Sequence, residues 1–200
     1  MNKLDSFDLE RFVKAQDDCY QQVLAELDEG RKSTHWIWFI FPQVTGLGSS
    51  RTSEVFSIKS RDEAEAYLLH STLGPRLIQC IGKVVEHADL SAREIFGFPD
   101  FLKFHSSLTL FFIISREKKI YKQAIDIFYQ GKLDEKTIEK LNKIWCPNKR
   151  NAFRFTSFFL FFFEMTFSIY DHRNYEFIWY RLKLVAGFEG IYVYAVCLCS

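Results

Sequence analysis

Apolar residues recur at steps of three and four along most of the first 140 residues, which is the spacing of one buried face on an α-helix. No Asn-Gly hairpin, alternating strand series or long repeat interrupts this pattern. The pattern therefore predicts a compact, all-α, multihelical domain over about residues 5–143. The expected helices cover residues 7–29, 34–41, 60–70, 75–85, 91–97, 117–129 and 134–143, with a further apolar segment at 100–115.

Several helix ends carry recognisable signals. Ser60 with Glu63, and Ser91 with Glu94, have the spacing of a capping box, and Asp134 stands where it can cap the last helix. Gly30 is placed to end the first helix. Within 117–129, the residues expected to face inward are Ile120, Ala124, Ile127 and Phe128.

The first predicted helix has a charged face as well as an apolar one. That face carries Lys14, Asp17, Asp18 and Glu26. Because charged side chains are rarely buried without a partner, we interpret it as solvated and assign its carboxylates no catalytic role. Ser33 or Thr34 is placed to cap the second helix, which Pro42 prevents from continuing in regular form.

A polar and aromatic cluster interrupts the apolar run at residues 35–43. His35, Trp36, Trp38 and Gln43 stand there, and a buried imidazole or carboxamide must be hydrogen-bonded. One interpretation makes both indoles core anchors, with His35 and Gln43 bonded to loop backbone. The other makes the indoles a stacking wall of a pocket, with His35 as acid, base or orienting group and Gln43 as a hydrogen-bonding partner. Helical spacing places Trp36 on a different face from His35 and Trp38.

A glycine-containing loop follows this run. Gly46, Gly48, Ser49 and Arg51 could form an anion-binding nest in which backbone N–H groups point at a phosphate or carboxylate. The alternative is an ordinary loop that needs positive φ. The spacing is neither that of a dinucleotide-binding fingerprint nor that of a P-loop.

A lysine and a serine form the third candidate. Lys103 and Ser107 are four residues apart and so share a helical face, as a charge-and-hydroxyl pair would. A snorkelling lysine and a serine bonded to its own helix backbone are the alternative.

Composition excludes several classes of protein. The net charge of +1 provides no field that would recruit nucleic acid. The five cysteines form no metal-binding spacing, and no apolar export signal is visible, so we expect a cytoplasmic protein with reduced thiols. No HExxH or GxSxG motif is present, and we predict no metal site and no cofactor.

Residues 144–200 differ from the rest of the chain. The chain contains 22 Phe, and a dense run of them lies between Phe153 and Phe163. We expect an atypical extension, and one hypothesis is that read-through of an intron or an altered exon encodes it. A membrane anchor within 155–199 is the rival, but the apolar run 155–170 contains Glu164 and is shorter than the roughly 20 residues that a spanning helix needs.

Motifs across residues 5–143 resemble one known family. The string Gly-Arg-Lys-Ser-Thr-His-Trp-Ile-Trp-Phe-Ile-Phe-Pro-Gln at 30–43, continued by Gly46-Leu47-Gly48, is similar to the signature of the domain-of-unknown-function 1810 family. Further similar segments lie at 57–60, 73–77, 95–97, 106–111 and 128–137. The resemblance implies a fold and a site in residues 30–51, but no reaction, since the family has no established activity.

Two hypotheses for function follow. The first is a domain that binds a small anionic molecule, such as a nucleotide- or ADP-ribose-like metabolite, between residues 35–51 and the segment Lys103–Ser107. Arg51 and Lys103 would then hold the anion. The second is a protein-interaction module in which the aromatic run is core. An exposed apolar face away from these residues would favour the second.

Overall fold

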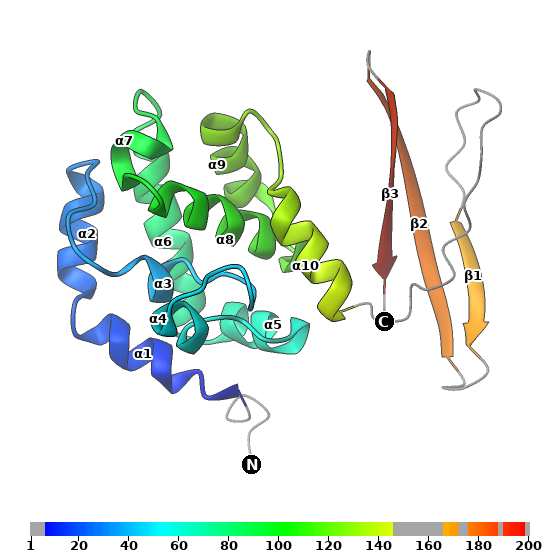
Figure 1. Cartoon of the computed structure of the whole chain (residues 1–200), viewed down its shortest axis with the longest axis horizontal. Coiled ribbons are helices and arrows are strands. Elements are labelled where there is room, and N and C mark those ends of the chain that lie inside the picture. Colours follow the sequence, from blue (N-terminus) through cyan, green and yellow to red (C-terminus); the bar gives the residue numbers. More distant parts are fainter. Residues whose placement is uncertain (1–6, 146–165, 172–175, 188–189, 199–200) are drawn as a thin grey trace. The chain divides into compact units, whose positions relative to one another are not determined.

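The computed structural model describes residues 7–145, 166–171, 176–187 and 190–198. The chain divides into two compact units, residues 1–151 and 152–200. In the described residues, the first unit is helical and the second contains β-strands (Figure 1). The prediction of a compact all-α domain is confirmed for the first unit. The predicted boundary at residue 143 stays a prediction.

Ten helices make up the described part of the first unit. They are α1 (Glu10–Asp17), α2 (Tyr20–Asp28), α3 (Ile37–Ile40), α4 (Arg51–Val55), α5 (Arg61–Leu69), α6 (Leu73–Glu86), α7 (Ala92–Phe96), α8 (Asp100–Ile114), α9 (Lys119–Tyr129) and α10 (Glu135–Trp145). Three of the expected caps are present. The Ser60 and Ser91 hydroxyls accept from the N–H groups of Glu63 and Glu94, at 3.1 and 3.2 Å, and Asp134 Oδ2 accepts from Thr137 N at 3.2 Å.

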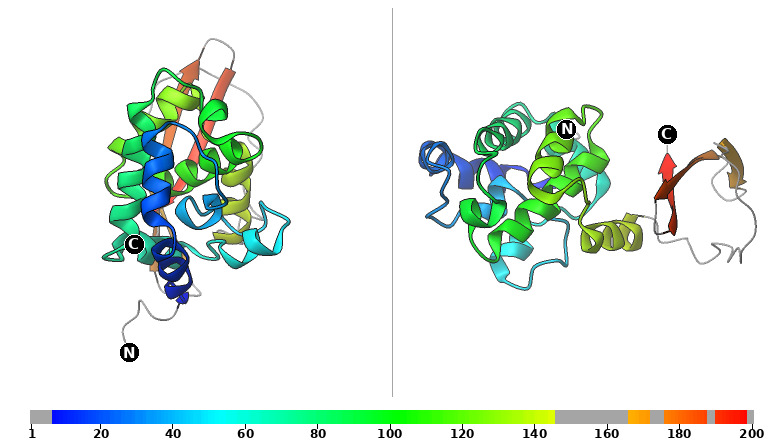
Figure 2. Two further views of the ribbon diagram at one scale, coloured as in Figure 1. Left: turned by 90° about the vertical axis from the view of Figure 1, so that its left-hand side faces the viewer. Right: turned by 90° about the horizontal axis from the view of Figure 1, so that it is seen from above.

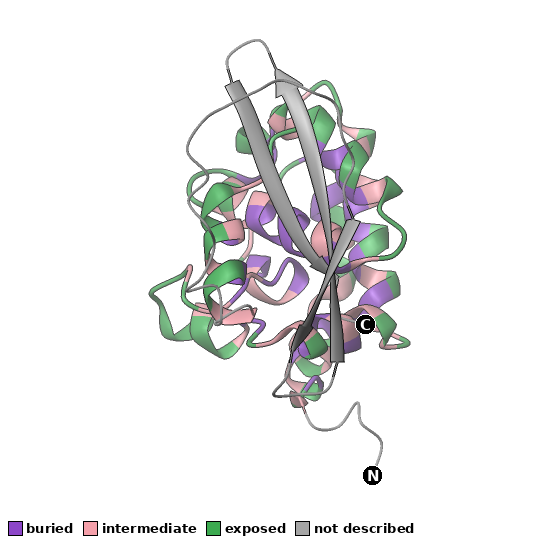
Figure 3. Ribbon diagram, turned by 90° about the vertical axis from the view of Figure 1, so that its right-hand side faces the viewer, coloured by how far each residue is buried: buried purple, intermediate pink, exposed green. Residues whose placement is uncertain are grey.

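Helix α8 is the centre of the domain. It packs against α3, α5, α7, α9 and α10, and lies among its neighbours in the two views of Figure 2. Its residues from Phe104 to Phe111 are buried except His105, and Figure 3 shows the buried residues along the inner sides of the helices. An apolar surface on every side is what a helix in this position needs.

Aromatic rings connect the helices inside the core. The Phe104 ring lies 4.7 Å from Phe41 and 4.6 Å from Phe96, measured between ring centroids. Tyr67 lies 5.1 Å from Phe12 and 5.3 Å from Phe111. These contacts join α1, α5, α7 and α8 to the residues around α3, and within the run at 35–43 the core residues are Trp36, Ile37, Ile40 and Phe41.

The single helix expected over residues 7–29 is wrong, because the chain breaks at Asp18 and Cys19. Cys19 has φ −142° and ψ 5°, outside the helical region, and its thiol donates to the carbonyl of Ala15. The break lets α1 pack on α3 while α2 packs on α6. The apolar residues of α1 and α2 continue the same spacing of three and four residues across the break. Periodicity alone therefore did not reveal it. Gly30, with φ +66°, follows the end of α2 as expected.

Two further details differ from the predictions. Helix α3 begins after Trp36 without a side-chain cap, since the backbone N–H groups of Ser33 and Thr34 bind a carboxylate instead. On α9, Ile127 is 37% exposed, whereas Ile125 is buried. The inward face of α9 is centred on Tyr121, Ala124 and Ile125.

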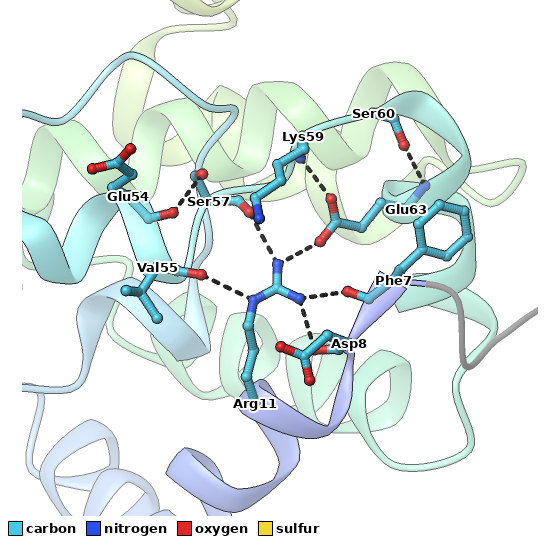
Figure 4. Close-up of polar contacts among 9 residues, drawn as sticks. All are labelled: Phe7, Asp8, Arg11, Glu54, Val55, Ser57, Lys59, Ser60 and Glu63. Carbon is cyan, nitrogen blue, oxygen red and sulfur yellow. Dashed lines mark hydrogen bonds and ion pairs between the residues drawn. The ribbon is translucent and has the colours of Figure 1, made fainter.

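Arg11 ties α1 to the segment between α4 and α5 (Figure 4). Its guanidinium donates to the carbonyls of Phe7, Asp8, Val55 and Ser57, at 2.6, 2.7, 2.9 and 3.1 Å, and to the carboxylate of Glu63. Glu63 also accepts from Lys59 N at 2.7 Å, so its carboxylate does not complete the box with Ser60. The side chains of Arg11 and Glu63 are only 11% and 3% exposed. These donors and acceptors belong to one network, which is buried at Glu63 and Ser57 and reaches the surface at Asp8 and Val55.

The second unit contains a three-stranded antiparallel sheet in order β1-β2-β3. The strands are β1 (Thr166–Asp171), β2 (Glu176–Gly187) and β3 (Gly190–Leu198), with Ile169 opposite Ile178 and Leu184 opposite Val193. The sequence analysis predicted no secondary structure for residues 144–200, so these strands overturn no prediction. β2 and β3 contain many β-branched and aromatic residues, which favour strands. The dense Phe run at 153–163 lies outside the described residues.

Candidate functional site

A buried carboxylate organises the turn before α3. Glu26 of α2 accepts hydrogen bonds from the backbone N–H groups of Ser33 and Thr34, at 2.8 and 3.1 Å, and from the indole N–H of Trp36 at 2.7 Å. The Thr34 hydroxyl donates to its other oxygen. The interpretation of Glu26 as solvated is therefore wrong. It is 5% exposed, because the turn folds back over α2 and supplies the donors that a buried carboxylate needs.

These hydrogen bonds determine the charge of Glu26. Burial by itself raises the pKa of the carboxyl group, but the bonds from Thr34, Ser33 and Trp36 outweigh it and lower the pKa from 4.5 to about 2. The group is therefore ionised at neutral pH. Its donors already occupy both oxygens, which makes Glu26 an anchor for the turn and not a proton-transfer group.

The anchored turn separates the residues of the predicted pocket. Trp36 is 1% exposed, packs against Phe41 and Phe96, and presents no open ring face on which a ligand could stack. This agrees with its interpretation as a core anchor. His35, which follows Thr34 and precedes Trp36, is exposed, and Trp38 is half-buried. His35 and Trp36 both precede α3, so the turn separates them and not the helical spacing on which the prediction was based.

Two lysines and one aspartate form an ion cluster beside these indoles. Asp100 accepts from Lys32 Nζ at 2.6 Å and from Lys103 Nζ at 2.7 Å. Lys103 Nζ lies 4.4 Å from the ring centroid of Trp38, and Lys32 Nζ lies 5.4 Å from that of Trp36. The three charged side chains are 7 to 18% exposed. Two cations share one anion, so the cluster carries one uncompensated positive charge in a partly buried setting.

Ser107 and Gln43, two other predicted site residues, form no side-chain hydrogen bond or ion pair with a described residue. Ser107 is buried, and its hydroxyl has no hydrogen-bond partner in the described structure. The neighbouring Ser106 hydroxyl, by contrast, donates to Asp134 at 2.7 Å. Gln43 is half-buried, and its backbone carbonyl accepts from Ile58 N at 2.9 Å. This bond fixes the start of the glycine loop against the segment before α5.

The glycine loop lies against another helix. Gly46 has φ +80°, and a Cβ placed on it would lie 2.9 Å from Nζ of Lys140 on α10. A Cβ on Gly48 would lie 2.5 Å from the Ser53 side chain. Ser49 and Arg51 are exposed. Glycine is favoured at 46 because of its positive φ; the Lys140 side chain that lies against it is flexible and could move aside for a Cβ.

Comparison with known proteins identifies the family. The model of the family described as "Protein of unknown function (DUF1810)" matches residues 6–141. The chain belongs to the DUF1810 family. It is also similar to the crystal structure, at 1.38 Å, of the conserved hypothetical protein Rv1873 from Mycobacterium tuberculosis, with 46% identity and a TM-score of 0.66. The match covers 68% of this chain and 96% of that one. No curated protein matches the chain.

The DUF1810 domain brings some of the predicted residues together and leaves others apart. Trp38 and Lys103 are in direct contact, while the glycine loop contacts Lys140. Sequence reasoning missed Lys32, Asp100 and Lys140 as parts of these clusters. Lys32 lies within the signature string, and Asp100 is three residues before Lys103. The sequence therefore shows both residues, but it does not show that they form an ion pair.

No group of three or more His, Cys, Asp or Glu side chains in the described part of the chain could hold a metal ion. Among the described helices, none combines the length and the apolar character that crossing a bilayer requires.

The ion pairs of the Lys32–Asp100–Lys103 cluster predict how the pKa of Asp100 responds to a substitution. Burial raises the pKa of this carboxyl group, but the hydrogen bonds and charges of Lys103 and Lys32 outweigh burial and hold the pKa below 3.8. Replacing Lys103 with methionine should therefore raise the Asp100 pKa. Carboxyl ¹³C NMR titration measures it. Lys122→Met, which removes the exposed partner of Asp126 on α9, is the matched control and should leave Asp100 unchanged. An unchanged pKa in Lys103→Met would show that the contact with Asp100 does not form.

Proposed function

We propose that the DUF1810 domain binds a small anionic molecule at the surface around Lys32, Lys103, Trp38 and His35. The ligand class we favour is a nucleotide- or ADP-ribose-like metabolite. In this proposal the lysines attract the anionic group, Trp38 offers aromatic surface, and the exposed imidazole of His35 orients the ligand or exchanges a proton with it. Trp36 and Glu26 hold the turn that displays His35.

The arrangement of Lys32, Asp100 and Lys103 carries the proposal. A purely structural ion pair needs one lysine for one carboxylate, but here two lysines of limited exposure share Asp100. Holding two ammonium groups close together in a partly desolvated position is unfavourable, and an additional anion would relieve that repulsion. Both cations also lie over indole rings, which positions them while leaving hydrogen-bond donors on each ammonium group.

A second candidate function rests on exposed aromatic surface. Phe98 is 73% exposed and Leu102, four residues later, is 46% exposed. Phe101 is half-buried with its ring centroid 6.4 Å from that of Phe98. An exposed apolar group can bind a protein partner. This group lies beside Asp100 and Lys103 and not away from them, so it meets only part of the criterion for an interaction module. If this group binds a partner, Phe98→Ser should abolish binding of that protein and leave small anions unaffected.

A thermal-shift screen of the full chain tests the first candidate. The compounds are AMP, ADP-ribose, ribose 5-phosphate, NAD and free amino acids. A ligand present at a hundred times its dissociation constant adds about 2.7 kcal/mol to the free energy of unfolding, so a binder should raise the melting temperature measurably. We expect a phosphate-bearing compound to do so and free amino acids to have no effect. If no anionic compound raises the melting temperature, the proposal fails.

A further inference from the structure

Lys140 differs from the other half-buried cations of the described residues. Six other lysines and arginines of the described residues are half-buried, and each of them pairs with a carboxylate. They are Arg11, Lys32, Arg61, Arg76, Lys83 and Lys103. Lys140 is half-buried as well, yet it forms neither an ion pair nor a side-chain hydrogen bond with any described residue. The ammonium group of Lys140 is not among the buried atoms that lack a partner in the described residues, so it keeps contact with solvent and its hydrogen-bond donors are available to a ligand.

Lys140 lies beside a loop whose amide groups have no acceptor among the described residues. Its ammonium group lies against Gly46, where it would touch a Cβ at 2.9 Å. The backbone N–H groups of Gly46, Gly48 and Ser49 donate to no acceptor within the described part of the chain, whereas Thr45 N, just before them, donates to Ile58 O at 2.9 Å. A lysine and several unused amide donors therefore meet in one exposed loop. Several amide donors in one loop beside a cation suit a compact anion with several acceptor oxygens.

We propose that Lys140 and the loop Gly46–Ser49 form a phosphate-binding subsite, separate from the Lys32–Asp100–Lys103 cluster. Phosphate fits because its oxygens can accept from the ammonium group and from several amides at once, while a carboxylate has only two oxygens. This inference does not depend on binding at Lys103. If both sites bind, the natural ligand carries at least two anionic groups.

The test is a titration of the ¹⁵N-labelled full chain with inorganic phosphate, with acetate at equal ionic strength as the non-phosphate anion. Amide shifts of Gly46, Gly48 and Ser49 should saturate with phosphate and hardly move with acetate. Lys140→Met keeps the apolar stem but removes the charge, and should weaken phosphate binding about tenfold or more. Lys119→Met is the control, since Lys119 is exposed on α9 and forms no ion pair with a described residue; it should bind like the wild type.

The outcomes separate this inference from the proposed function. Loss of the loop shifts in Lys140→Met, with normal shifts in Lys103→Met, supports the subsite. Wild-type binding by Lys140→Met, or equal binding of acetate, overturns it. If phosphate moves only the Trp38 indole signal and Lys103→Met alone abolishes that effect, the subsite is wrong while anion binding at the Lys103 cluster remains supported.

Discussion

Replacing Glu26 with alanine should lower the free energy of unfolding by about 3 to 5 kcal/mol, as expected when a buried, fully hydrogen-bonded charge is removed. The substitution leaves the indole N–H of Trp36 and the backbone N–H groups of Ser33 and Thr34 without their acceptor. Urea denaturation of the full chain measures the change. Glu29→Ala, at an exposed position just after the same helix, should change stability by no more than about 0.5 kcal/mol.

The same carboxylate predicts a dependence of stability on pH. Because its pKa is about 2 in the folded protein and ordinarily 4.5, ionised Glu26 stabilises the fold above about pH 4.5, and this contribution is lost as pH falls toward 2. The difference corresponds to about 3 kcal/mol. Glu26→Gln should therefore show a shallower loss of stability between pH 4.5 and 2 than the wild type. Equal slopes for the two proteins would mean that Glu26 does not accept these hydrogen bonds.

The second large effect is expected at Arg11. Arg11→Ala removes five hydrogen bonds, four to main-chain carbonyls and one to Glu63, and leaves the buried Glu63 carboxylate without its cation (Figure 4). Breaking a buried pair in this way costs about 3 to 5 kcal/mol. Arg11→Lys should recover little of the loss, because an ammonium group has three donors and lacks the planar geometry of guanidinium.

Arg61 provides the control for this measurement. It pairs with Glu65 one turn along the same helix, but the two side chains are 41% and 46% exposed. Arg61→Ala should therefore change the free energy of unfolding by no more than about 0.5 kcal/mol. The account of the Arg11 network is contradicted if Arg11→Ala and Arg61→Ala are equally stable in urea.

Local features of the fold were predictable from the sequence. The capping residues Ser91 and Asp134 act within one helical turn, so their spacing along the chain is also their spacing in space. Gly30 follows the end of α2 for a similar reason, because a residue with positive φ commonly follows the last turn of a helix.

The features that sequence analysis missed depend on partners distant in the chain. Arg11 and Glu63 are 52 residues apart, and Glu26 was assigned to solvent because its helix pattern is amphipathic without it. A carboxylate on a charged face looks solvated until a turn with free N–H groups folds over it. Lys32 and Asp100 likewise come together only because Lys32 N donates to Ile95 O at 2.7 Å, which brings residues 30–36 to the start of α8.

The most direct test of the central claim is a calorimetric titration of ADP-ribose, AMP and ribose 5-phosphate into the full chain and into Lys103→Met. That variant preserves the apolar stem over Trp38 and removes one of the two cations at Asp100. Lys122→Met, which breaks an exposed pair on α9, is the control. The account predicts that at least one of these compounds binds the wild type and the control equally and Lys103→Met about tenfold more weakly. Binding that Lys103→Met does not weaken, or no binding of any of the three compounds, would contradict it.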